Sequence, residues 1–153
     1  MIMKYKKFNS KDRKMIALVA HDNMKDDLVN WCGNYKDKLS FHKLFATGTT
    51  GRLLTKKVQL PVTKLISGPL GGDQQIGALI TENEIDMLIF LWDPLEAQPH
   101  DPDVKALLRL AAVWNIPVAC NLASADFLIN SDLFDKAYIR KVPDYVHYLS
   151  ERV

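Results

Sequence analysis

The segment KLISGPLGGDQQ, residues 64–75, decides the fold of this 153-residue chain. It starts with a strand-like run, Lys64–Ser67, and a helical pattern with one apolar face follows from Asp73 to Glu82. The glycine, serine and proline residues between the two mark a tight turn. A second segment, ATGTTG at residues 46–51, repeats this arrangement after the strand-like run Phe41–Ala46. Both segments therefore predict a strand that passes directly into a helix.

The same alternation runs through most of the chain. Strands are predicted at Met15–Ala20, Phe41–Ala46, Lys64–Ser67, Met87–Trp92 and Pro117–Cys120. Helices are predicted at Met24–Trp31, Gly51–Lys57, Asp73–Glu82, Val104–Trp114, from Ser124 onward, and at Asp144–Arg152. This order predicts an α/β fold, a single doubly wound domain with a mostly parallel sheet of about five strands and helices on both faces.

Composition narrows the class of protein. Apolar residues make up 48% of the chain and charged residues 25%, as in ordinary globular proteins. The net charge of +2 predicts no nucleic-acid partner, and no apolar run is long enough to predict a membrane partner. We see no signal peptide, and Cys32 and Cys120 have neither the spacing of metal ligands nor that of a disulfide framework. We therefore expect a cytoplasmic protein in which both thiols are reduced and buried.

The two ends of the domain are assigned from charge. Five lysines lie within the first fourteen residues, Lys14 among them, and they predict a solvated segment. Residues 1–12 are therefore expected to form a polar N-terminal arm, and residues 13–153 the single domain. His42 and His147 are expected at the surface.

Polar residues follow each predicted strand at the point where it ends. They are His21, the run 47–50, Ser67 with Gly68, Asp93 and Asn121. Because parallel strands end at one edge of a sheet, we expect these residues to share the edge where open α/β sheets bind their ligands.

The two glycine-containing segments favour a phosphate site. Small residues allow backbone N–H groups to approach an anion, and hydroxyl groups and a helix N-terminus add favourable charge. Lys25, one helical turn after His21, can add a cation. Neither segment has the spacing of a Walker A loop or a dinucleotide fingerprint, and simple tight turns with a solvated Lys25 are the alternative.

Carboxylates near these segments suggest chemistry in addition to binding. Asp73 ends the second segment, where a site for phosphate alone would avoid negative charge. The stretch from Asp93 to Asp103 holds three prolines and places His100 among carboxylates, as in loops that position an acid and a base. The alternative is structural: Asp73 and Asp93 as caps, and Asp103 as a favourable charge in a first helical turn.

These residues together resemble the methylglyoxal synthase family. The resemblance covers nearly the whole chain from Met15 onward and excludes the first dozen residues. It rests on five segments: Ala20-His21-Asp22 with Lys25, residues 46–51, residues 67–75, Trp92-Asp93-Pro94, and residues 99–107. The segments at 67–75 and 99–107 are long and specific.

The resemblance implies an enzyme that converts dihydroxyacetone phosphate to methylglyoxal and inorganic phosphate. It implies a homohexamer that needs no metal and no organic cofactor. It makes Asp73 the base, with His21 and His100 at the substrate oxygens and Asp93 and Asp103 as supporting carboxylates. It assigns the phosphate contacts to Lys25, Thr47, Gly48, Thr49, Thr50, Ser67 and Gly68. The alternative is a non-catalytic regulatory domain of the same fold that binds a phosphorylated effector.

Overall fold

A five-stranded parallel sheet forms the centre of the computed structural model, which describes residues 2–97 and 101–152. Its strand order is β4-β3-β2-β5-β6. The strands are β2 (Met15–Ala20), β3 (Lys43–Thr47), β4 (Val62–Leu65), β5 (Met87–Leu91) and β6 (Val118–Ala119). Every residue of β5 is buried, as its unbroken apolar run predicts for an interior strand. The predicted parallel sheet is confirmed.

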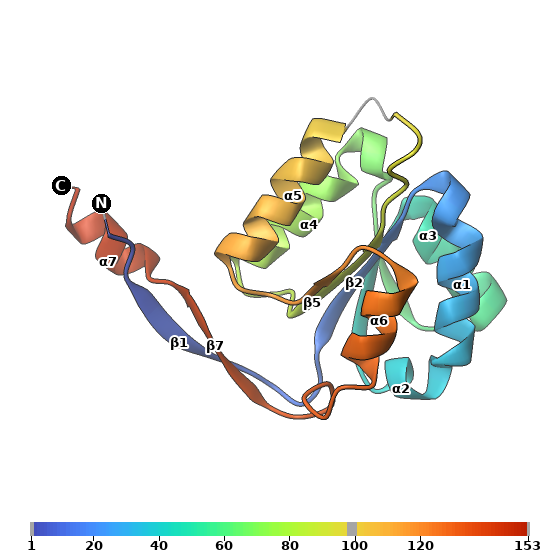
Figure 1. Ribbon diagram of the computed structural model, residues 1–153, viewed down its shortest axis with the longest axis horizontal. Helices are drawn as coiled ribbons and strands as arrows, with labels where there is room; N and C mark the ends of the chain where they lie inside the picture. The colour runs from blue at the N-terminus through green and yellow to red at the C-terminus, as the bar shows by residue number, and fades with distance from the viewer. Residues whose placement is uncertain (1, 98–100, 153) are drawn as a thin grey trace.

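Helices cover both faces of this sheet, which confirms the doubly wound architecture (Figure 1). Residues alternate along β2, so that Ile16 and Leu18 join one core and Ala17 and Val19 the other. One face is covered by α1 (Lys25–Asn34), α2 (Lys36–Ser40), α3 (Gly48–Leu53) and α6 (Leu122–Ile129). The opposite face is covered by α4 (Gly72–Thr81) and α5 (Asp101–Val113). Among the residues described, none of these helices is long and apolar enough to cross a membrane.

Some boundaries differ from the sequence prediction. Helix α3 begins at Gly48 instead of Gly51, so the first residues of the predicted loop form a helical turn, and the helix continues as a π-helical segment, η2 (Leu54–Val58). Short 3₁₀ turns, η1 (Asp22–Met24) and η3 (Gly68–Leu70), follow β2 and β4. Helix α2 was not predicted. Asn121 is the N-cap of α6, where its Oδ1 accepts the Ser124 N–H at 2.9 Å.

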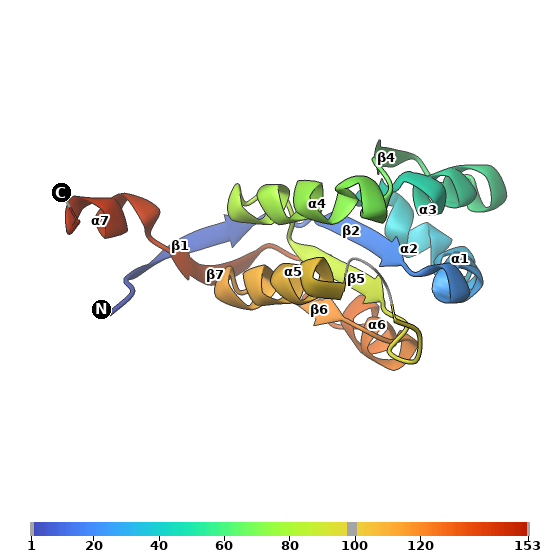
Figure 2. The same ribbon diagram turned by 90° about the horizontal axis from the view of Figure 1, so that it is seen from above.

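An antiparallel ribbon projects from the domain and carries both chain ends (Figure 1; Figure 2). It pairs β1 (Tyr5–Ser10) with β7 (Tyr138–Pro143), and α7 (Tyr145–Ser150) follows at its far end. We call the ribbon and α7 the arm. The sequence analysis predicted neither strand. The reason is that most residues of β1 are exposed and β7 has charged residues at its centre, so no regular apolar alternation marks either strand.

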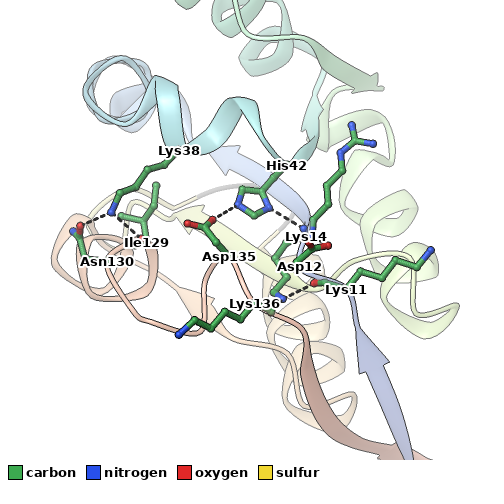
Figure 3. A network of polar contacts seen from close by, with 10 residues as sticks. Lys11, Asp12, Lys14, Lys38, His42, Ile129, Asn130, Asp135 and Lys136 are labelled. Atoms are coloured by element: carbon green, nitrogen blue, oxygen red, sulfur yellow. Dashed lines mark hydrogen bonds and ion pairs between the residues drawn. The ribbon is translucent and has the colours of Figure 1, made fainter.

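A buried polar cluster holds the root of the arm (Figure 3). The Lys14 ammonium donates to the carbonyls of Lys11 and Lys136, and the Lys14 N–H donates to His42 Nδ1 at 2.8 Å. The Nε2 of His42 contacts Asp135 Oδ1, also at 2.8 Å. Burial lowers the pKa of the Lys14 ammonium and of the His42 imidazole. The expectation that Lys14 is solvated and His42 lies at the surface was therefore wrong, because their partners come from distant segments.

A buried arginine on β7 also anchors the arm. Arg140 on β7 is only 2% exposed, and its guanidinium donates to the Trp114 carbonyl at 2.7 Å. It also lies 3.8 Å from Asp86 Oδ1 and stacks over the Phe8 ring. The arm therefore contacts the domain through buried polar side chains at Lys14 and at Arg140.

Gly72 allows the start of α4 to pack directly on the end of β4. A Cβ atom at this position would lie 2.2 Å from the Ile66 carbonyl oxygen, a backbone atom that cannot rotate away. The preceding Gly71 has a φ of +111°, which also favours glycine. Glycine is thus required at the turn on which the fold depends.

We expect Gly72→Ala to lower the free energy of unfolding by about 1–3 kcal/mol or more, because the new methyl group overpacks a backbone contact. Urea denaturation followed by circular dichroism measures this. The matched control is Gly33→Ala, since a Cβ at Gly33 on α1 would meet nothing within 4 Å. That change should stabilise the protein by up to about 1 kcal/mol. A Gly72→Ala protein as stable as its parent would show that the close contact is absent.

Candidate active site

A pocket of about 260 Å³ lies at the carboxyl edge of the sheet. Its walls come from the ends of β2 and β3 and from the turns that follow β2, β3 and β4. Most of the predicted site residues line it: His21, Lys25, Thr47, Thr49, Thr50, Ser67, Gly68 and Asp73. Segments far apart in the sequence therefore meet at the edge that the strand order predicts.

The two glycine-containing turns pack directly on each other. Thr47 is the N-cap of α3 and Ser67 the N-cap of η3, so each turn presents the start of a helical segment. A Cβ at Gly48 would lie 2.7 Å from Ser67 Oγ, and the Gly48 N–H donates to the Ile66 carbonyl at 3.3 Å. Gly48 is not among the residues that line the pocket. Its visible role is to let the two turns approach.

Gln75 supports the second turn and was not singled out from the sequence. Its Oε1 accepts the N–H of Ile66 at 2.9 Å, so one side chain from the first turns of α4 holds the residue just after β4. The feature of the sequence that could have identified Gln75 is its position at the end of the segment 67–75. A glutamine there reads equally well as a solvated helix residue.

Lys25 supplies positive charge at the pocket wall. Its ammonium is hydrogen-bonded to the Asp22 carboxylate, which is 90% exposed, while the Lys25 side chain is only 18% exposed. The contact with Lys25 lowers the pKa of Asp22. Lys25 is thus held beside the pocket by a carboxylate that faces solvent.

Asp73 brings a buried carboxylate to the same pocket. It is the second residue of α4 and only 4% exposed. Gly71 occupies the N-cap position, so the interpretation of Asp73 as the cap of this helix is wrong. Asp73 also borders a second hollow between α4 and α5, which Asp103 lines as well. Asp73 therefore separates the pocket from this α4–α5 groove.

The proton position on His21 is set by a backbone contact. Its Nδ1 accepts the N–H of Asp93 at 3.1 Å, and its ring meets Phe90 edge-on, with 5.3 Å between centroids. A ring nitrogen that accepts a hydrogen bond carries no proton, so neutral His21 has its proton on Nε2. Phe90, which also lines the pocket, was missed because it reads as an ordinary core residue of β5.

Asp93 lies beside His21 but is not one of the pocket-lining residues. Its Oδ2 accepts the Asn23 amide and its Oδ1 accepts the Leu95 N–H, each at 3.0 Å. The Asn23 hydrogen bond, followed by the Leu95 N–H, holds the pKa of Asp93 below its ordinary value. Asn23 was missed, since nothing in the sequence marks an asparagine in a short turn as the partner of a distant carboxylate.

Two further predictions have different outcomes. Asp103, on the first turn of α5, lies in the α4–α5 groove with Asp73. His100 falls outside the residues that the structure describes. Within residues 2–97 and 101–152, no group of three or more histidine, cysteine, aspartate or glutamate side chains is arranged to hold a metal ion.

Known proteins resemble this chain over nearly its whole length. Residues 27–120 match the family described as the MGS-like domain. Methylglyoxal synthase of Cellvibrio japonicus is 59% identical over 150 residues, which cover 98% of this chain and 97% of that protein. Methylglyoxal synthase of Saccharophagus degradans is 64% identical over 140 residues, which cover 92% of this chain and 91% of that protein.

A solved structure agrees with the fold. The crystal structure of methylglyoxal synthase from Elizabethkingia anophelis NUHP1 matches with a TM-score of 0.88 and 51% identity, covering 94% of this chain and 95% of that one. Sequence, fold and the polar pocket thus lead to one assignment: this chain belongs to the methylglyoxal synthase family.

Proposed function

We propose that this chain is a lyase that converts dihydroxyacetone phosphate to methylglyoxal and inorganic phosphate. The observation that carries the proposal is the buried carboxylate of Asp73 in one pocket with Lys25 and the hydroxyl groups of Thr47, Thr49 and Ser67. This arrangement suits an anionic substrate that must also lose a proton. The relatives quoted above carry the enzyme's name, and nothing favours the binding-only alternative.

The substrate phosphate would lie against the two turns. Lys25 contributes charge, while the hydroxyls of Thr47, Thr49, Thr50 and Ser67 and the backbone at Gly68 contribute donors. Gly48 would act by allowing the turns to close on the anion, as its contact with Ser67 suggests. This grip places the rest of the substrate toward Asp73.

Asp73 would then remove a proton from the hydroxymethyl carbon beside the ketone, which gives an enediolate. Neutral His21, with its proton on Nε2, would donate to a substrate oxygen as negative charge develops there. His100 is proposed for the other oxygen, and Asp93 and Asp103 as supporting carboxylates.

Phosphate leaves from the carbon on the other side of the former ketone. Its C–O bond breaks while the enediolate electrons form a new C=C bond, and the resulting enol takes a proton on carbon to give methylglyoxal. The breaking bond must stand roughly perpendicular to the enediolate plane for this overlap. The two turns therefore bind the phosphate and also set the torsion that permits its loss.

We also propose that the protein acts in the cytoplasm as a homohexamer that phosphate inhibits, with communication between subunits. The arm supports association, because its exposed apolar side chains include Ile139, Tyr145 and Val146. Arg152, whose guanidinium lies over the Tyr148 ring near the arm's end, would approach a neighbouring subunit's pocket.

The central test adds dihydroxyacetone phosphate alone and measures released phosphate and methylglyoxal together. The parent should form both in equal amounts.

Asp73→Asn should reduce turnover by at least about 10²–10⁴-fold, because the amide cannot accept the substrate proton. Binding of a phosphoglycolate-like mimic, measured by calorimetry, should survive or tighten, since a negative charge is removed. Near-normal turnover in Asp73→Asn would return this residue to a structural role and make Asp103 or Asp93 the candidate base.

Lys25→Ala and Thr49→Ala test the phosphate contacts. Each removes a hydrogen bond to the dianion worth roughly 1.5–3 kcal/mol, so the apparent affinity should fall about 10-fold to 100-fold. Steady-state kinetics measures this, and inhibition by inorganic phosphate should weaken in the same variants. Lys56→Ala, an exposed lysine on η2 that does not line the pocket, is the control. Unchanged affinity in both site variants would show that phosphate binds elsewhere.

Sedimentation velocity tests the assembly. The parent should sediment as six chains of 17.4 kDa at assay concentrations. Val146→Asp, which places a charge on an exposed apolar position of α7, should shift the distribution toward smaller species. A monomeric parent would contradict the proposed hexamer.

A further inference from the structure

Asn23 joins two segments that meet at the edge of the pocket. It lies in η1, two residues after His21, and is itself exposed. Its amide nitrogen donates to Asp93 Oδ2 at 3.0 Å and also contacts Glu96 Oε2. An amide NH₂ has two donors, so this one side chain can serve both carboxylates. Asn23 therefore ties the turn after β2 to the loop after β5.

The tie leads directly to His21. The other oxygen of Asp93 accepts the Leu95 N–H, so the Asp93 carboxylate is held from both sides. The backbone N–H of the same residue donates to His21 Nδ1 at 3.1 Å. Asn23 thus acts on the residue whose backbone decides which nitrogen of His21 carries the proton.

Charge explains why an amide is suited to this position. Asp93 and Glu96 are three residues apart in one loop, and two carboxylates drawn together repel each other. The neutral Asn23 side chain lies between them as a donor and adds no charge beside His21 or the pocket. Without it, the loop loses the contact that opposes this repulsion, and the Asp93 N–H is free to move away from His21.

We propose that Asn23 is a positioning residue that holds Asp93, and through it keeps the proton of the neutral His21 ring on Nε2. The kinetic consequence rests on the function proposed above. The consequence for the His21 ring does not, and it can be measured with no substrate present.

The first measurement is the tautomer of His21 in protein labelled with ¹⁵N-histidine, read from long-range ¹H–¹⁵N correlation spectra. His21→Gln assigns its signals. In the parent, His21 should be in the Nε2–H form. In Asn23→Ala the Nδ1–H form, or rapid exchange between the two forms, should appear. His42 is an internal control, because its Nδ1 accepts the Lys14 N–H and should not respond.

The second measurement is the kinetics of methylglyoxal formation. Asn23→Ala should lower kcat by about 10-fold to 100-fold, since small displacements of catalytic groups carry losses of this size. KM should change little, because Asn23 does not line the pocket. Asn23→Asp keeps the shape but replaces the donors with a third carboxylate, so its loss of kcat should be larger. Asn30→Ala, the same change at an exposed position on α1, should leave both constants unaltered.

The outcomes separate the two proposals. Unchanged His21 signals in Asn23→Ala overturn the positioning role whatever the activity does, and so does an Asn23→Asp protein as active as its parent. A shifted tautomer with unchanged kcat would support the positioning role and contradict the part proposed for His21 in the reaction. If the parent itself forms no methylglyoxal, the proposed function fails, while the spectra still decide the role of Asn23. Because Asn23 is exposed, its variants should keep the parent's melting temperature, and circular dichroism checks this.

Discussion

The close backbone contact around Ile66 is the constraint on which the pocket depends. The carbonyl of Ile66 accepts the Gly48 N–H, and the N–H of Ile66 donates to the Gln75 side chain. Gly72 packs against the same carbonyl so closely that no side chain would fit there. One residue after an edge strand therefore places the starts of α3 and α4, which come from opposite faces of the sheet. Because both helices begin at this point, their first turns face one small volume, and their N-terminal partial charges add there.

The pocket holds both the negative charge of Asp73 and the positive charge of Lys25, and the carboxylates near it differ in burial. Asp73 is nearly inaccessible, whereas the Asp22 carboxylate that holds Lys25 is almost fully exposed. Asp22 is well solvated, so its attraction for Lys25 is weakened by water, and an anion in the pocket can compete for the ammonium. A carboxylate that is exposed can orient a cation without cancelling its charge inside the pocket. A buried carboxylate is suited to accept a proton, because little water is present to stabilise its charged form.

Sequence reasoning succeeded where local pattern and site chemistry coincide, as in the apolar run of β5 and the glycine turns after β3 and β4. It placed Lys25, Thr49 and Asp73 at one edge correctly, because parallel strands must end there. It failed where the deciding partner is distant in sequence. Lys14 and His42 are polar residues whose burial depends on Lys136 and Asp135. The amide of Asn23 likewise finds its partner, Asp93, only when folding brings the loop after β5 beside it. Those interactions are properties of the folded chain, and no spacing rule contains them.

The pairing of β1 with β7 has a consequence for how the chain is made. Tyr5 pairs with Pro143 and Ser10 with Tyr138, so β1 must wait for β7, which is synthesised more than a hundred residues later. The parallel sheet, by contrast, is complete once β6 has emerged at Ala119. Domains fold as their segments become available during synthesis, and contacts of large sequence separation form slowly. The pocket can therefore take shape on a nascent chain in which β1 is still unpaired. The arm, and any assembly that relies on it, forms only after β7 has emerged.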